Sequence, residues 1–122
     1  MDLSFCAIVK NEELTLPKCL GSVKDLVDEM VILDTGSSDR TSEIAREFGA
    51  RVYDFPWGND FAAARNESLK YVNGDWVLVL DADEVLVEER IPQIREVIKS
   101  QYLLVNLVRQ EIGASQSPYS LV

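Results

Sequence analysis

The sequence has no histidine, few basic residues and only two cysteines, and each shortage excludes a class of function. The lack of histidine removes the commonest general base and the commonest metal-ligating side chain. Lysine and arginine total 12 against 21 aspartates and glutamates, which gives a net charge of −9 and an isoelectric point near 4.4. Binding to nucleic acid draws its affinity from clustered cations, so no nucleic-acid partner is expected. The chemistry should therefore use carboxylates, or a metal ion held by oxygen atoms.

Long apolar runs are missing as well. The longest, at residues 5–9 and 76–80, have the length of a strand and fall short of the roughly 20 residues that a membrane span requires. With no basic leader at the start of the chain, we expect a cytoplasmic protein, a location compatible with work at the inner face of the cell membrane. Cys6 and Cys19 lie in apolar stretches and are expected to be buried free thiols.

What is present is a regular alternation of strand-like and helix-like segments. The chain has 122 residues, of which 47% are hydrophobic, enough for one compact domain. This pattern predicts an α/β fold with a Rossmann-like, mostly parallel sheet and helices on both faces. Strands are expected at 3–9, 29–33, 51–55, 76–80 and 102–108, and helices at 16–27, 44–48, 61–72 and 91–98, whereas the last ten residues show no period.

Individual residues mark the helix ends. Pro17 fits the first turn of the first helix, and Gly49 and Asn73-Gly74 are typical stop signals. Asp39 and Asp60 are suited to capping the helices that follow them. In the third helix, Phe61, Ala64 and Ser68 recur at the spacing of one helix face.

Acidic residues follow three of the predicted strands. They occupy segments 10–12, 34–39 and 81–84, and in an open parallel sheet the carboxyl ends of the strands form the ligand-binding edge. Asp81 and Asp83, two residues apart after a buried strand, can reach one hard cation. Two plainer interpretations stay open, with Asp39 serving only as a helix cap and residues 81–83 forming a solvated turn. Arg65, next to Asn66, suits a surface role as well as a ligand-binding one.

Two short matches point to other enzyme classes. Residues 34–38, Asp-Thr-Gly-Ser-Ser, resemble the active-site loop of pepsin-like aspartic proteases, but that interpretation needs an all-β fold and a partner loop. Residues 77–86 resemble the first motif of haloacid-dehalogenase-type phosphatases, with Asp81 as nucleophile and Asp83 as acid and base. Little chain remains for the later lysine and paired aspartates of such enzymes, so the phosphatase is the alternative rather than the main hypothesis.

Four blocks taken together resemble the inverting family 2 glycosyltransferases of the GT-A fold. They are Ala-Ile-Val-Lys-Asn-Glu-Glu at 7–13, the segment 31–41 around Asp34-Thr35-Gly36, Phe-Ala-Ala-Ala-Arg-Asn at 61–66, and the segment 74–84 that ends in Asp-Ala-Asp-Glu. The resemblance covers most of residues 1–90. The nearest subgroup is that of bacterial glucosyltransferases that build lipopolysaccharide core or related envelope glycans.

The resemblance implies a site for a nucleotide-sugar donor, with a UDP-sugar favoured. Asn11, Glu12 and Asp34 would face the nucleoside, and Arg65 would lie near the nucleoside and diphosphate. Asp81 would approach the ribose or a metal-bound water, and Asp83 would coordinate the Mn²⁺ or Mg²⁺ ion that bridges the phosphates. Such a cation would let an acidic edge accept a diphosphate.

The family also uses an aspartate general base, located well after the Asp-x-Asp turn. Nothing between Glu84 and Val122 matches its surroundings. We therefore expect residues 1–122 to be the donor-binding N-terminal portion of a truncated GT-A domain, with no catalytic base of its own and little or no activity alone. The acceptor would be a glycan or a lipid-linked glycan. A non-catalytic nucleotide-binding module is a further alternative, and an exposed sheet edge would permit a homodimer.

Overall fold

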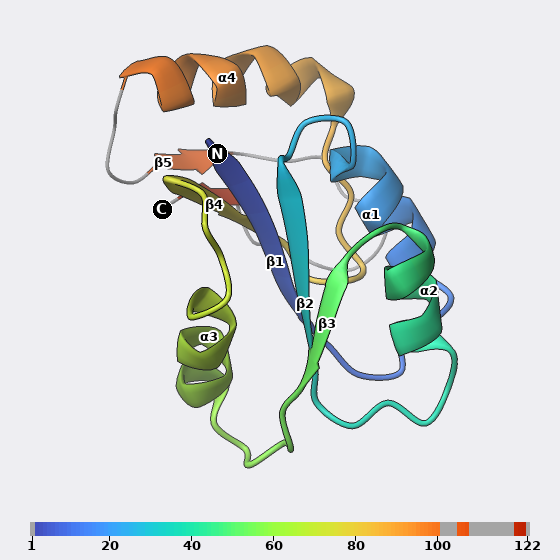
Figure 1. The fold of residues 1–122 in the computed structure, drawn as a ribbon. Helices are drawn as coiled ribbons and strands as arrows, with labels where there is room; N and C mark the ends of the chain where they lie inside the picture. The colour runs from blue at the N-terminus through green and yellow to red at the C-terminus, as the bar shows by residue number, and fades with distance from the viewer. Residues whose placement is uncertain (1, 101–104, 108–118, 122) are drawn as a thin grey trace.

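The computed structural model describes residues 2–100, 105–107 and 119–121, and it shows an α/β fold (Figure 1). Four strands run parallel and are joined by helices. This confirms the Rossmann-like fold class. The elements in chain order are β1 Leu3–Val9, α1 Leu16–Val23, β2 Glu29–Asp34, α2 Thr41–Glu47, β3 Arg51–Asp54, α3 Phe61–Leu69 and β4 Trp76–Val79.

The sheet has six strands in the order β3-β2-β1-β4-β6-β5. A short 3₁₀ turn, Glu88–Arg90, and α4 (Ile91–Ser100) follow β4, and then come β5 (Val105–Leu107) and β6 (Tyr119–Leu121). β6 pairs antiparallel with both β4 and β5, so the sheet is mostly parallel as predicted. The last ten residues show no period in the sequence and yet contain β6, because three residues are too few to show an alternating pattern.

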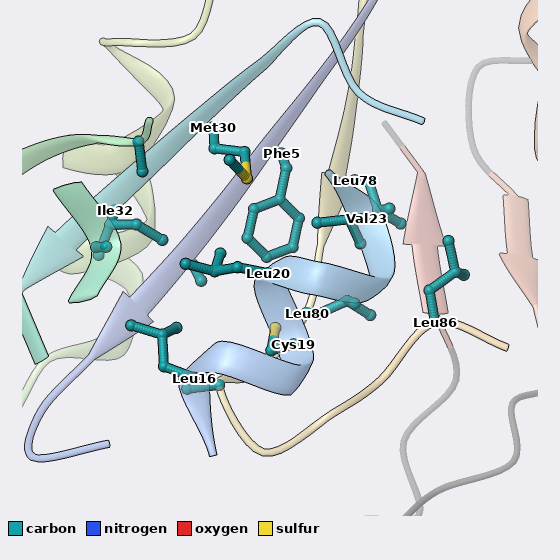
Figure 2. Close-up of a cluster of buried hydrophobic side chains, with 14 of the residues drawn as sticks. Phe5, Leu16, Cys19, Leu20, Val23, Met30, Ile32, Leu78, Leu80 and Leu86 are labelled. Carbon is teal, nitrogen blue, oxygen red and sulfur yellow. The ribbon is translucent and has the colours of Figure 1, made fainter. Parts of the chain in front are cut away.

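Helices cover both faces of the sheet, with α1 and α2 on one side and α3 on the other (Figure 1). Alternate residues of β1 explain this arrangement, since successive side chains of a strand point to opposite faces. Phe5 belongs to the larger core and Cys6 to the smaller one under α3. Figure 2 shows α1 laying a stripe of buried side chains over the larger core, namely Leu16, Cys19, Leu20 and Val23.

Of three predicted helix features, two differ from the structure and one is confirmed. α1 ends at Val23 rather than near residue 27, and the chain turns there, with Leu26 N donating to Val23 O at 2.9 Å. Asp60 caps α3 as predicted, accepting from Ala63 N at 3.1 Å. Phe61, however, is not on the buried face of α3, because its side chain is 64% exposed.

The C-terminal elements were predicted in part. α4 begins at Ile91 and buries Ile94, as its periodicity indicates. β5 confirms the middle of the strand expected at 102–108, and the rest of that strand lies outside the described residues. Over the ranges that the structure describes, no helix combines the length and apolarity needed to cross a membrane.

Candidate functional site

A cavity of about 410 Å³ opens at the carboxyl ends of the central strands. Ligand pockets typically have volumes of roughly 300–1,000 Å³, and open parallel sheets bind their ligands at this edge. The loops after β1, β2, β3 and β4 all contribute to its walls. The lining residues are Ile8, Val9, Lys10, Glu12, Thr35, Trp57, Phe61, Asp81, Ala82 and Asp83.

The turn after β4 presents two carboxylates to this cavity. Asp81 and Asp83 are exposed, whereas Ala82 and Glu84 between and after them are buried. Two hydrogen bonds close the turn: Glu84 N donates to Asp81 O at 3.0 Å, and Asp81 N donates to Glu84 Oε1 at 2.6 Å. The predicted pair therefore lies in one fixed turn with both side chains on the cavity side.

The thiol of Cys19 in α1 is hydrogen-bonded to the turn after β4. Cys19 Sγ donates to Asp81 O at 3.6 Å. Burial, together with the negative charges of Glu84, Asp81 and Asp83, raises the pKa of the Cys19 thiol to about 12. The thiol is therefore protonated at neutral pH. Both cysteines are buried and free, as the sequence predicts.

The loop after β1 is hydrogen-bonded to the loop after β2. Asn11 has a φ of 53°, a left-handed conformation that asparagine tolerates better than most residues. Its backbone N–H donates to Ser37 Oγ at 2.9 Å, and its side-chain Oδ1 accepts from Ser38 N at 2.8 Å. Glu12 N donates to Thr41 Oγ1 at 2.8 Å. The structure thus brings Asn11 and Glu12 beside segment 34–41, but only Glu12 lines the cavity.

Asp34 is 3% exposed and holds the loop that follows β2. Its Oδ1 accepts from Gly36 N at 2.9 Å and from Ser37 N at 2.8 Å, and its Oδ2 accepts from the Ser42 hydroxyl. Burial raises the pKa of Asp34, but the hydrogen bonds from Ser42, Ser37 and Gly36 outweigh burial and set this pKa below its usual value. Asp34 is consequently ionised at neutral pH, and it is not among the cavity-lining residues.

The N-cap residue of α2 is Arg40, so the interpretation of Asp39 as the helix cap is wrong by one position, although Asp39 does bind the first residue of the helix. Its Oδ1 accepts from Thr41 N at 2.9 Å, and its Oδ2 accepts from Glu13 N at 3.3 Å. These contacts tie the loops after β1 and β2 together a second time. The Asp-Thr-Gly-Ser-Ser segment therefore leads into a helix of an α/β fold, which excludes the aspartic-protease interpretation.

Arg65 is exposed on α3, one helical turn after Phe61, and it is not among the residues that line the cavity. Its guanidinium is nevertheless close enough to β1 to affect Cys6. Burial raises the pKa of the Cys6 thiol, and a hydrogen bond from Ser68 and the charge of Arg65 partly oppose this effect.

Thr35 falls within the segment 34–39 that the sequence places at the binding edge, whereas Trp57 was not predicted as a cavity residue and Phe61 was predicted to face a helix core. Thr35 is buried and donates through Oγ1 to Val9 O at 3.0 Å, so it fixes the loop at the cavity floor. Trp57 and Phe61 meet edge to face, with ring centroids 5.0 Å apart. The available signal was the pair of aromatic residues in the otherwise polar segment 56–61.

The acidic residues of the cavity suit a metal ion whose remaining coordination positions are filled by a bound ligand. Among the described residues, no group of three or more histidine, cysteine, aspartate or glutamate side chains is placed to hold a metal ion. Three acidic residues line the cavity, Glu12, Asp81 and Asp83, and the last two lie in the same turn. Mg²⁺ and similar ions are commonly held by one or two carboxylates together with waters and substrate phosphates. The residues present therefore fit a metal bound together with a phosphorylated ligand.

The chain belongs to glycosyl transferase family 2, since residues 4–122 match that family. A TPR repeat-containing protein of Synechococcus elongatus is 48% identical over 119 residues, which cover 97% of this chain and 30% of the relative. The glycosyltransferase SunS of Bacillus subtilis is 36% identical over 100 residues, covering 75% of this chain and 22% of SunS. The chain thus spans less than a third of the length of these two relatives.

Solved structures agree with this assignment. TarS of Staphylococcus aureus (residues 1–349) superposes with a TM-score of 0.80 at 21% identity, covering 95% of this chain and 39% of TarS, and shows the fold. Glucosyl-3-phosphoglycerate synthase of Mycobacterium tuberculosis, solved with Mn²⁺, UDP-glucose and phosphoglyceric acid, has a TM-score of 0.67 at 28% identity. That match covers 80% of this chain and 39% of the synthase. Family membership favours a glycosyltransferase over the phosphatase alternative.

Proposed function

We propose that this chain binds a UDP-sugar together with Mn²⁺ or Mg²⁺, as the donor-binding portion of an inverting glycosyltransferase. The observation that carries the proposal is the fixed turn after β4, which presents Asp81 and Asp83 to the cavity at the carboxyl edge of the sheet. The Mycobacterium tuberculosis synthase, solved with Mn²⁺ and UDP-glucose, supports the ligand class.

In this proposal Asp83, Asp81 and Lys10 have distinct tasks in the cavity. Asp83 holds the cation and Asp81 contacts the ribose or a water on the cation. Two exposed carboxylates this close repel each other, and a cation relieves that repulsion. When bound, the divalent ion neutralises the diphosphate and stabilises it as a leaving group. Lys10, at the end of β1, adds a positive charge to the same cavity.

The nucleoside would lie toward the loops after β1 and β2. Asn11 and Glu12 shape that side through their hydrogen bonds to segment 37–41. Asp34 already accepts three hydrogen bonds, yet a carboxylate offers about four lone-pair sites, so Oδ2 can accept a further one from an imide N–H of the base. Arg65 would approach the nucleoside and diphosphate from α3.

Sugar transfer itself belongs to the whole protein. A general base must deprotonate the acceptor hydroxyl, and we expect it from outside residues 1–122, so the 122-residue chain should bind donor without robust transfer. A glycan or lipid-linked glycan of the bacterial envelope, such as lipopolysaccharide core, is the proposed acceptor. The proposal also includes two predictions, that the protein acts at the inner face of the cell membrane and that it forms a homodimer through an exposed sheet edge.

Calorimetric titration with UDP tests the donor site. UDP, GDP and dTDP are titrated into the chain in Mn²⁺ and again in EDTA, on wild type, Asp83→Ala and Asp75→Ala. Asp75 is an exposed aspartate at the opposite end of β4, so its variant makes the same chemical change away from the cavity. We expect metal-dependent UDP binding that Asp83→Ala abolishes and Asp75→Ala retains. Absence of binding by folded wild-type chain would refute the proposal.

A further inference from the structure

Trp57 and Phe61 line the cavity without serving the hydrophobic cores. Neither ring belongs to the two core clusters among the described residues. Phe61 is 64% exposed although it begins a helix whose other face is buried. A single exposed apolar residue needs no explanation, but two aromatic rings that meet at a cavity wall do.

The two rings are held in place by their own segment. Trp57 Nε1 donates to Asn59 Oδ1 at 2.9 Å, which fixes the indole. The Phe61 ring packs against it at an interplanar angle of 76°. Asp60 caps the first turn of α3 and so sets where Phe61 projects. An aromatic surface fixed in this way loses little freedom when a ligand binds.

The rings and the carboxylates reach the cavity from different parts of the sheet. In the strand order β3-β2-β1-β4, Asp81 and Asp83 follow β4 on one side of β1. Trp57 follows β3 on the other side, and α3, which carries Phe61, packs on β1 and β2. Figure 1 shows the connection from β3 to α3 at the end of the sheet where these strands terminate. A ligand that spans the cavity would meet carboxylates at one end and aromatic rings at the other.

We infer that Trp57 and Phe61 form the surface that contacts the nucleobase of the donor. The inference rests on the proposed function and names a part of its site. In a nucleoside diphosphate sugar, the base and the sugar lie on opposite sides of the diphosphate. With the diphosphate and cation at Asp81 and Asp83, the flat base extends toward the β2 and β3 side, where the rings lie. Base–aromatic contact is tolerant of the base and contributes substantially to binding.

The test measures UDP binding in Mn²⁺ by calorimetry on Phe61→Ala, Trp57→Ala and Trp57→Phe. Loss of one stacking contact should raise the Kd for UDP by roughly 5- to 150-fold in the alanine variants. Trp57→Phe keeps an aromatic ring and should bind within a few-fold of wild type. Leu14→Ala is the control, because Leu14 is also a large hydrophobic residue, is 91% exposed and does not line the cavity.

Tryptophan fluorescence gives a second readout. The chain has two tryptophans, and Trp76 is only 8% exposed at the start of β4. Saturating UDP should therefore quench the emission of Trp57, and Trp57→Phe should remove the quench while binding persists. Unchanged Kd values in both alanine variants, or a full quench in Trp57→Phe, would overturn the inference alone. Failure of wild type to bind UDP would overturn the proposed function and the inference with it.

Discussion

Gly74, at the turn before β4, is a position where one added methyl group should strongly destabilise the fold. A Cβ at this position would lie 2.6 Å from Ser4 Oγ and 2.8 Å from Ser4 N. Ser4 is fully buried in β1, and its hydroxyl accepts from Gly74 N at 2.8 Å while donating to the Glu29 carboxylate. Since the clash involves backbone of the central strand, side-chain rotation cannot relieve it.

The expected cost of Gly74→Ala follows from these contacts. Overpacking a filled site costs about 1–3 kcal/mol, and losing the Gly74–Ser4 hydrogen bond costs about 0.5–1.5 kcal/mol. The free energy of unfolding should therefore fall by roughly 2–4 kcal/mol. For a chain of this length, that loss lowers the melting temperature by on the order of 10 °C.

Gly21→Ala provides the opposite case. Gly21 lies within α1, and a Cβ there would meet no atom within 4 Å. Alanine in a helix interior is more stable than glycine by about 1 kcal/mol, so this variant should be slightly stabilised. Thermal and urea unfolding followed by far-UV circular dichroism compare the two. A melting temperature of Gly74→Ala equal to wild type, or equal losses in both variants, would refute the reasoning.

Two further predictions concern the cavity charge and the thiols. Lys10→Ala should raise the Kd for UDP by about two- to fivefold, which is the range of an exposed ion pair, and the increase should be smaller at high salt. Lys18 lies on the exposed side of α1, so Lys18→Ala should leave the Kd unchanged. Calorimetry measures both values. Cys6 and Cys19 are at most 1% exposed with raised pKa values, so Ellman's reagent at pH 8 should label neither in folded chain and both in guanidinium. Rapid labelling of native chain would contradict their burial.

The parallel core was predictable because its strands carry an unusually direct signal. A strand covered on both faces must be apolar at nearly every position, and β1 and β2 are buried at nearly every residue. Helix ends were less predictable. α1 stops at Val23 although Leu26 and Val27 continue the apolar spacing, because both still pack on the same core from the turn that follows. Periodicity alone does not distinguish these two ways of burying a side chain.

The candidate site was predictable where it depends on local spacing. Asp81 and Asp83 could be placed on the cavity side because alternate residues of one turn face the same way. Trp57 could not, because its position depends on where the connection after β3 passes the sheet edge, which is a tertiary property. β6 was missed both because it is only three residues long and because its pairing with β4 is a tertiary property that joins residues more than 40 positions apart.

Asp34 shows why residue type and position do not by themselves distinguish a ligand-binding carboxylate from a structural one. Both roles require an ionised carboxylate at the end of a buried strand, and both give the same sequence. The partners make the difference: at Asp34 they are two backbone N–H groups of the loop that follows and the hydroxyl of Ser42 in the first turn of α2. Their hydrogen bonds to the charged form lower its pKa despite burial. Any contact of Asp34 with a nucleoside must therefore be additional to its role in holding this loop. An Asp34→Asn variant removes the negative charge that the loop hydrogen bonds stabilise, so it would weaken the loop as well as any contact with the ligand.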